Sequence, residues 1–164
     1  MSLSIIFARS SNHCIGHQGK VPWVLPDEYQ HFDQTTADTA IIMGRRTYED
    51  HCCEIPGRLN IVISRQPNYP TASGVLLTDS LTSAISLATA HHYRQCFVIG
   101  GSNLIVAALG QATDVFETIV DAQIGGDTYV PVLNFAAFNS SRILEHAIDQ
   151  DHKLAFLILH HQRR

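Results

Sequence analysis

The chain reads Ile15-Gly16-His17-Gln18-Gly19-Lys20-Val21-Pro22-Trp23-Val24-Leu25-Pro26-Asp27-Glu28-Tyr29-Gln30-His31-Phe32 near its N-terminus. Pro26 lacks a backbone N–H and has a fixed φ, so it suits the first turn of a helix, where N–H groups have no partner within the helix. We therefore expect a helix to begin at Pro26. A loop punctuated by glycine places Trp23 just before this helix, an arrangement typical of the entrance to an active site.

Glu28 is the acid of interest in this helix. The spacing from Glu28 to later residues favours one helix face that carries a carboxylate beside aromatic side chains. These residues are Tyr29, Phe32, Thr35 and Thr36. Burial there would raise the pKa of Glu28 above its ordinary value of about 4.3, which suits proton transfer near neutral pH. The alternative is a solvated first-turn acid that interacts with the helix dipole, and the segment alone leaves both interpretations open.

Composition indicates one soluble domain spanning residues 1–164, because 164 residues bury a core without disulfides. No run of about 18 apolar residues occurs, and the N-terminus lacks the features of a signal peptide, so we expect a cytoplasmic protein. The net charge of −4 without a basic stripe argues against nucleic acid as the main partner. The lack of a long apolar run argues against a membrane partner. We expect a monomer that binds small molecules.

The cysteines and histidines do not show the spacing of a metal site. Neither a zinc-type pair nor a C-x-x-C motif occurs, so we interpret Cys14, Cys52, Cys53 and Cys96 as reduced thiols. The ten histidines are scattered, with two adjacent pairs at His91-His92 and His160-His161 rather than one-face spacing. The sequence therefore predicts no bound metal.

Strand and helix signals alternate along the chain. Short runs rich in Ile and Val predict strands at 3–8, 40–43, 59–63, 74–77, 96–99, 115–121 and 154–160. Helices are expected at 26–36, 46–50, 81–91 and 102–109. This order predicts an α/β domain with a mostly parallel central sheet. Segments 141–147 and 153–160 flank the turn-like Asp149-Gln150-Asp151, which indicates an antiparallel hairpin at the sheet edge.

Two strand-to-helix junctions carry glycine and suit phosphate binding. The first is Met43-Gly44-Arg45-Arg46-Thr47, where helix N–H groups and guanidinium forks would meet an anion. The second is Ile99-Gly100-Gly101-Ser102-Asn103, where small residues let the backbone approach a pyrophosphate. Each is weak alone, because a glycine pair is often only a tight turn. Together, at one end of a parallel sheet, they favour a dinucleotide.

Two further residues have a functional and an ordinary interpretation. Arg58 follows the turn Ile55-Pro56-Gly57 and precedes a strand, where its guanidinium could bind a substrate carboxylate or simply lie on the surface. Thr118 could hydrogen-bond an active-site carboxylate, although threonine is common in strands without such a role.

The ordered set of motifs resembles the dihydrofolate reductase family from the first strand to the last. The matching segments are Ala8, Ile15-Gly16, Pro22-Trp23-x-Leu25-Pro26-x-Glu28 with Phe32, Met43-Gly44-Arg45-x-Thr47, Pro56-Gly57-Arg58-x-Asn60, Ile99-Gly100-Gly101-Ser102 and Gly126-Asp127-Thr128. The resemblance implies an eight-stranded sheet, its last strand antiparallel, flanked by four helices. It also implies hydride transfer from NADPH to C6 of 7,8-dihydrofolate, with a proton added at N5.

The resemblance assigns expected roles on the substrate side. Glu28 would bind the N–H edge of the pterin and support protonation, Trp23 would hold a water, and Thr118 would orient the carboxylate. Arg58 would bind the glutamate α-carboxylate. The other expected substrate contacts are Ile6, Phe7, Ala8, Tyr29, Phe32, His51, Ile55 and Ile99.

On the cofactor side, the resemblance places Ala8, Ile15 and Ile99 at the nicotinamide and Arg45, Ser64 and Arg65 at the 2′-phosphate. The pyrophosphate would lie among Arg46, Thr47, Gly100, Gly101, Ser102 and Asn103, and further contacts are expected from Gly16, Val21, Gly44, Leu104 and Thr128. The loop 9–24 resembles the mobile loop of the family, supported by a second loop that contains Gly126.

Several positions depart from the family pattern, and among them Phe7 and Tyr29 are bulkier than is common. The segment Asp50-His51-Cys52-Cys53-Glu54 also differs from the usual one. Ile105 stands where an aromatic residue near the nicotinamide is usual, and His51 stands at a normally apolar place beside the benzoyl group. Two alternatives remain open: the pyrimidine reductase of riboflavin synthesis, which shares the fold, and a non-catalytic folate- or nucleotide-binding relative. Trp23 and Glu28 in register favour the folate enzyme.

Overall fold

The computed structural model describes residues 1–51 and 54–164. The prediction that Cys52 and Cys53 are reduced thiols falls outside the described residues, whereas Cys14 and Cys96 are free and buried. The chain forms two compact units, one of residues 1–5 with 36–112 and the other of residues 6–35 with 113–164. Strand β1 (Ser2–Ser10) contributes to both units.

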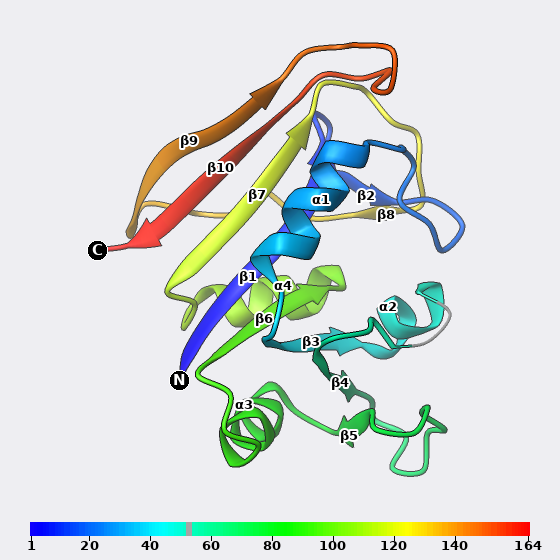
Figure 1. The fold of residues 1–164 in the computed structure, drawn as a ribbon, viewed down its shortest axis with the longest axis vertical. Coiled ribbons are helices and arrows are strands. Elements are labelled where there is room, and N and C mark those ends of the chain that lie inside the picture. The colour runs from blue at the N-terminus through cyan, green and yellow to red at the C-terminus, as the bar shows by residue number, and fades with distance from the viewer. Residues whose placement is uncertain (52–53) are drawn as a thin grey trace. The chain divides into compact units, whose positions relative to one another are not determined.

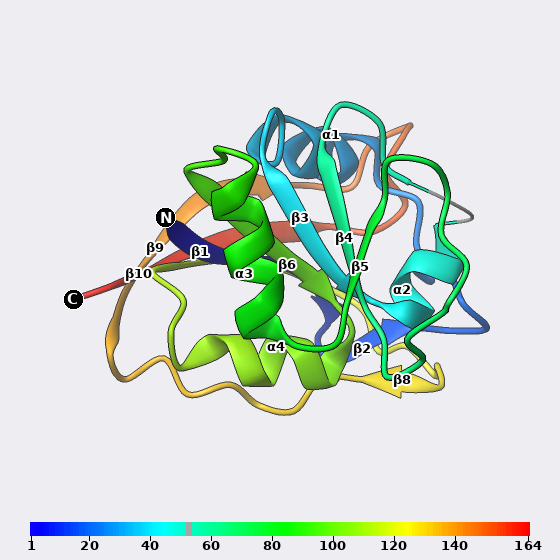
Figure 2. The ribbon, with the colours of Figure 1, turned by 90° about the horizontal axis from the view of Figure 1, so that it is seen from below.

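The first unit is built on parallel strands. The start of β1 pairs with β6 (Gln95–Gly100), β6 with β3 (Ala40–Gly44), β3 with β4 (Leu59–Ile63) and β4 with β5 (Leu76–Thr78), all in parallel. The helices are α2 (Arg45–Asp50), α3 (Leu81–Ala90) and α4 (Ser102–Leu109). Figure 2 shows β3, β4 and β5 side by side, with α2 directly after β3. The central strands are buried, as their unbroken Ile and Val runs predict.

The second unit is antiparallel. Strand β10 (Phe156–Arg163) pairs with β7 (Asp114–Val120) on one side and with β9 (Phe138–His146) on the other, and Figure 1 shows these three long strands side by side. Helix α1 (Pro26–Thr35) belongs to this unit, as does a small separate sheet of β2 (Cys14–Gly16) and β8 (Thr128–Tyr129). Its core cluster contains Trp23, Leu25, Val120, Phe156 and Ile158.

The predicted fold class is confirmed. Among the described residues, eight strands form one sheet in the order β5-β4-β3-β6-β1-β7-β10-β9, and the antiparallel pairs described in this sheet involve β10. The expected hairpin is β9–β10, and β9 is the edge strand. Within residues 1–51 and 54–164, none of the helices is long and apolar enough to cross a membrane.

Several predicted boundaries were wrong by a few residues, for local reasons. The strand expected at 74–77 is β5 at Leu76–Thr78, because Gly74 has a φ of 86° and belongs to the preceding turn. Helix α3 ends at Ala90 rather than 91, since His92 adopts a left-handed φ of 65°. Strand β9 begins at Phe138, three residues before the predicted start, and the small β2–β8 sheet was not predicted.

Candidate active site

Glu28 lies in the first turn of α1, and Thr118 of β7 donates a hydrogen bond to it. The distance from Thr118 Oγ1 to Glu28 Oε1 is 3.1 Å, and Thr118 is fully buried. Burial raises the pKa of Glu28, while the hydrogen bond from Thr118 lowers it by a smaller amount. The described residues provide no ion pair for this carboxylate, so its proton affinity is set mainly by loss of water.

The predicted face of α1 was only partly right. No residue of α1 is fully buried, and Tyr29 is 66% exposed, so the acid does not lie between two buried aromatic rings. The reason is geometric: Phe32 lies four residues after Glu28 on the same face, whereas Tyr29 is one residue on and about 100° around the helix. Phe32 is half-buried, with its ring centre 6.4 Å from that of Tyr29.

Trp23 and Leu25 enter the core just before α1. Both side chains are buried in the cluster with Val120, Phe156 and Ile158, and Ala8 of β1 packs against the same cluster. The indole Nε1 of Trp23 is buried and has no hydrogen-bond partner among the described residues. A buried N–H without a partner is uncommon, and such a group can donate to a water or to a ligand atom.

Strand β1 sends alternate side chains to opposite faces. Ile6 is buried and Ala8 packs beside Trp23, but the side chain of Phe7 lines a different cavity with Arg9 and Glu117. The side chain of Phe7 therefore faces away from those of Ile6 and Ala8, because side chains alternate between the two faces of a strand.

The turn before β4 holds Arg58 through a network centred on Asn60. Asn60 is buried; its Oδ1 accepts from the Ile55 N–H at 2.8 Å, and its Nδ2 donates to the carbonyls of Ile55 and Arg58 at 2.9 and 3.0 Å. The guanidinium of Arg58 donates to Thr36 Oγ1 at 3.2 Å and to the Pro56 carbonyl at 2.7 Å. Asn60 had no role predicted from the sequence, although its place in Pro56-Gly57-Arg58-x-Asn60 was the available signal.

The two glycine junctions of the first unit lie together. Strands β3 and β6 pair so that Met43 is opposite Gly100, and the N-caps of α2 and α4 are Gly44 and Gly101. Because both caps lack a side chain, the first-turn N–H groups of each helix are left for another acceptor. The sequence could predict the two junctions, and the sheet register brings them to one edge.

Gly100 lies close to the side chain of Thr47 in α2. Its φ is 144°, and a Cβ added there would lie 3.1 Å from Thr47 Oγ1. A side chain at Gly100 would thus fill the space beside Thr47. Of the other predicted cofactor residues, Ser102, Asn103 and Leu104 form the first turn of α4, and Ile99 precedes Gly100 in β6.

Arg45, Ser64 and Arg65 differ in how they are held. Arg45 Nε lies 3.9 Å from Glu49 Oε1, and its guanidinium is 5.9 Å from the ring centre of Tyr69, which donates to Glu49 at 2.8 Å. Ser64 is buried and accepts from the Gln66 N–H at 3.1 Å. Arg65 and Arg46 are exposed. Tyr69, which orients Arg45, was missed because it is distant in sequence.

The loop 13–20 is tied to residues 126–130, as the resemblance implied. Asp127 accepts from the Gln18 N–H at 2.8 Å and donates its own N–H to the Gly16 carbonyl at 3.1 Å. A Cβ at Gly126 would collide with Cys14 Sγ and the Gly16 carbonyl, so only glycine fits there. The cofactor contacts expected from this part of the chain lie in different surroundings. Ile15 and Gly16 are in β2 and Thr128 is in β8, whereas the side chain of Val21 is exposed.

Two of the departures from the family pattern, Ile105 and His51, have different surroundings. Ile105 is buried in α4, so it fills the core and presents no group to a ligand. His51 is exposed and caps the C-terminus of α2, where its N–H donates to the Thr47 carbonyl at 3.2 Å.

The chain is similar to proteins of one known family. The family model described as dihydrofolate reductase matches residues 2–163. "Dihydrofolate reductase type 3" of Salmonella typhimurium is 39% identical over 131 residues, covering 80% of this chain and 79% of that protein. Dihydrofolate reductase of Buchnera aphidicola subsp. Baizongia pistaciae is 36% identical over 149 residues, covering 89% of each.

A solved structure is also closely similar. It is described as dihydrofolate reductase from Enterococcus faecalis complexed with NADP(H) and RAB-propyl. The TM-score is 0.90 at 26% sequence identity, with 99% of this chain and 96% of that chain covered.

Proposed function

The chain belongs to the dihydrofolate reductase family, and we propose how its residues divide the work of that reaction. The activity is the NADPH-dependent reduction of 7,8-dihydrofolate to 5,6,7,8-tetrahydrofolate in folate metabolism. Family membership also decides against the pyrimidine reductase of riboflavin synthesis. NADPH supplies the hydride, and the protein supplies binding, orientation and control of the proton.

The hydrogen bond from Thr118 to Glu28 is the observation that carries the proposal. It fixes one carboxylate oxygen of Glu28 at the start of α1, and burial keeps the pKa of the group high. The two oxygens of a carboxylate lie in one plane, so they can accept two parallel hydrogen bonds from the pterin N–H edge. Glu28 is thus proposed to bind this edge and to support protonation at N5.

Trp23 is proposed to hold the water that accompanies this proton. Its buried Nε1 without a partner among the described residues supports that role, since the indole N–H needs an acceptor. Ile6, Ala8 and Phe32 are proposed to contact the substrate rings. A contact of Phe7 with substrate would run through its backbone, because its side chain faces elsewhere.

NADPH fits the glycine edge of the first unit. The space beside Thr47 that a Cβ at Gly100 would fill is proposed to accommodate the pyrophosphate, with N–H groups at the starts of α2 and α4 as donors. Arg45, Ser64 and Arg65 are proposed to bind the 2′-phosphate. Arg58, held by Asn60, is proposed to bind the glutamate α-carboxylate of the substrate.

The cofactor assignment is tested by Arg45→Ala. Loss of a charge-assisted contact to the 2′-phosphate is expected to raise KM for NADPH by about tenfold or more, with little change for NADH. Arg142→Ala, which removes an exposed arginine paired with Glu145, is the control. Equal losses for both nucleotides would place the 2′-phosphate elsewhere.

The catalytic assignment is tested by NADPH oxidation in the presence of dihydrofolate. Glu28→Gln is expected to reduce turnover by about 100-fold or more at neutral pH, with partial recovery at low pH where solvent protonates the substrate. Asp33→Asn, which removes a charge from the same helix, is the matched control and should retain activity. Full activity of Glu28→Gln at neutral pH would refute the role.

We also propose a cytoplasmic monomer that acts as one domain. One family model spans residues 2–163, and all residues proposed for the reaction come from one chain. The buried free thiols Cys14 and Cys96 suit a reducing compartment. Light scattering should give a mass near 18.2 kDa; twice that mass would refute the monomer.

A further inference from the structure

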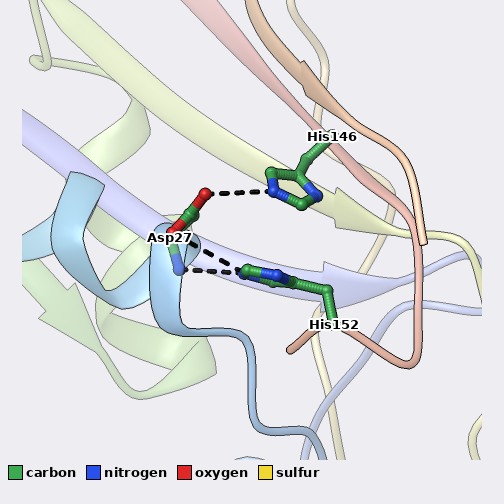
Figure 3. Close-up of side chains that lie close together, drawn as sticks. All are labelled: Asp27, His146 and His152. Atoms are coloured by element: carbon green, nitrogen blue, oxygen red, sulfur yellow. Dashed lines mark hydrogen bonds and ion pairs between the residues drawn. The ribbon is translucent and has the colours of Figure 1, made fainter. Parts of the chain in front are cut away.

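Three side chains from distant parts of the chain meet at the N-terminus of α1. Asp27 lies in the first turn of α1, His146 ends β9, and His152 lies in the connection to β10, and Figure 3 shows both imidazole rings beside Asp27. His146 Nε2 is 3.0 Å from Asp27 Oδ2, and His152 Nε2 is 3.9 Å from Asp27 Oδ1. One potential ligand atom from each residue lies within 4.8 Å of the others.

The ring of His146 presents Nε2 to the aspartate. Its Nδ1 is 2.6 Å from the Ala147 carbonyl, which only accepts, so Nδ1 must carry a proton. In the neutral ring, Nε2 then has a lone pair facing a carboxylate oxygen at 3.0 Å. Two acceptors at this distance repel unless a positive charge lies with them, either a proton on Nε2 or a metal ion. Phe156 stacks on the ring with centres 5.2 Å apart, which fixes its plane.

His152 is oriented in the same way by Asp149. Its Nδ1 donates to Asp149 Oδ1 at 2.9 Å, and the same oxygen accepts the N–H groups of Asp151 and His152 at 2.9 and 2.8 Å. Nε2 therefore has the lone pair, which accepts the Asp27 N–H at 3.0 Å. A carboxylate behind the far nitrogen of a histidine is the usual outer-shell support of a metal ligand.

Charge and burial also suit a cation. The carboxylates of Asp27 and Asp149 bring two negative charges, and Asp149 Oδ2 is 3.6 Å from His146 Nε2. The N-terminal end of the α1 dipole opposes a cation only weakly, so the two carboxylates outweigh it. The His152 side chain is 3% exposed and that of Asp27 49% exposed, which leaves the group anchored on one side and open to solvent on the other.

We propose that Asp27, His146 and His152 bind one divalent transition-metal ion of the Zn²⁺ class, with Asp149 as a positioning residue. Imidazole nitrogen and carboxylate oxygen are ligands for such ions, with metal–ligand distances of about 2.0–2.2 Å. Two ligands of one ion are then at most about 4.4 Å apart, so small side-chain rotations would close the present arrangement. His152 would release the Asp27 N–H, a first-turn group that has no acceptor within its helix in any case.

The site would connect the first turn of α1, one residue from Glu28, to the ends of β9 and β10. A metal bound only by the folded chain stabilises it, because binding is linked to folding. The spacing of the histidines in the sequence predicted no metal site, since residues 27, 146 and 152 share no local pattern. Only the fold brings them together.

Isothermal titration of the metal-free, reduced protein with ZnCl₂ at pH 7.5, in excess Mg²⁺, tests the proposal. We expect one Zn²⁺ per chain, with an affinity at least about tenfold weaker in His146→Gln and about tenfold weaker in Asp149→Asn. The matched control is His160→Gln, because His160 also pairs with a carboxylate, Asp114, at 2.8 Å but without a second histidine. Its Zn²⁺ affinity should equal that of the unchanged chain.

Thermal unfolding provides the second readout. Zn²⁺ should raise the Tm of the unchanged chain and of His160→Gln but not that of His146→Gln. If His146→Gln does not fold, Asp27→Asn takes its place, because that side chain is half-exposed and replaced by one of equal size. Equal Zn²⁺ binding with and without His146, or no saturable binding, would overturn the proposal and leave a protonated His146 paired with Asp27.

Discussion

Two carboxylates, the half-buried Glu28 and the buried Glu117, lie on the two faces of β7 and behave in opposite ways. Glu28 meets Thr118 on one face, and Glu117, the preceding residue of β7, lies on the other between Arg9 and His161. Burial raises the pKa of Glu28, and one neutral hydrogen bond does not reverse this. Burial also acts to raise the pKa of Glu117, but hydrogen bonds from His161 and Arg9 and the charge of Arg9 leave it lowered.

This difference shows that the hydrogen-bonding and charged partners of a carboxylate, more than its burial, decide whether its pKa is raised or lowered. Arg9 Nε donates to Glu117 Oε1 at 2.6 Å and His161 Nε2 donates to Oε2 at 3.0 Å, so both oxygens of Glu117 are occupied. His161 Nδ1 is hydrogen-bonded to Ser140 Oγ at 2.6 Å, and its ring stacks on that of Phe135 with the ring centres 3.7 Å apart. Glu117 is therefore a structural anion, whereas Glu28 keeps acceptor capacity for a substrate.

The largest expected effect in this comparison comes from Glu117→Gln. Arg9 and Glu117 have side chains only 14% and 6% exposed, so the change leaves Arg9 charged, buried and without its carboxylate. Breaking a buried pair in this way is expected to lower the free energy of unfolding by about 3 kcal/mol. Urea unfolding measures it, and turnover by the folded protein should be retained.

Glu145→Gln is the matched control for this variant. Glu145 pairs with Arg142 at 2.7 Å, but both side chains are more than half exposed, and such pairs contribute little. If the two variants lose equal stability, Glu117 does not act as a structural anion for Arg9.

The pH dependence of stability is the next smaller effect. The pKa of Glu117 is lower in the folded chain than in the unfolded chain, so its contribution is fully present above the unfolded value. This contribution is lost as the pH falls through the folded pKa. Urea unfolding between neutral and acidic pH should show the loss in the unchanged chain and a smaller slope in Glu117→Gln. Identical slopes would mean that Glu117 has the same pKa in both states.

The smallest effect is expected from Thr118→Val, which removes the hydroxyl while keeping the shape. Losing a hydrogen bond that favours the charged form should raise the pKa of Glu28 further. We expect kcat/KM to fall by less than about tenfold, which corresponds to one hydrogen bond. The pH profile of kcat/KM should move to higher pH. A loss as large as that of Glu28→Gln would show that Thr118 does more than orient the carboxylate.

The sequence predicted the place and partner of Glu28 but not those of Glu117. Pro26 marked the start of α1 and therefore placed Glu28 in its first turn, and the family resemblance named Thr118 as its partner. Glu117 had no signal, because its partners Arg9 and His161 are 108 and 44 residues away. Tyr29 was misplaced because neighbouring residues of a helix point about 100° apart.

The sequence by itself determined the order of the strands and helices of the large sheet, the glycine junctions after β3 and β6, and the turn that presents Arg58. These features depend on residues within one turn or one strand, where proline, glycine and apolar periodicity act through local sterics. Tertiary structure decided which side chains meet: Arg9 with Glu117, and Asp27 with His146 and His152. Distances between such groups follow from the packing of whole strands, and no local pattern encodes them.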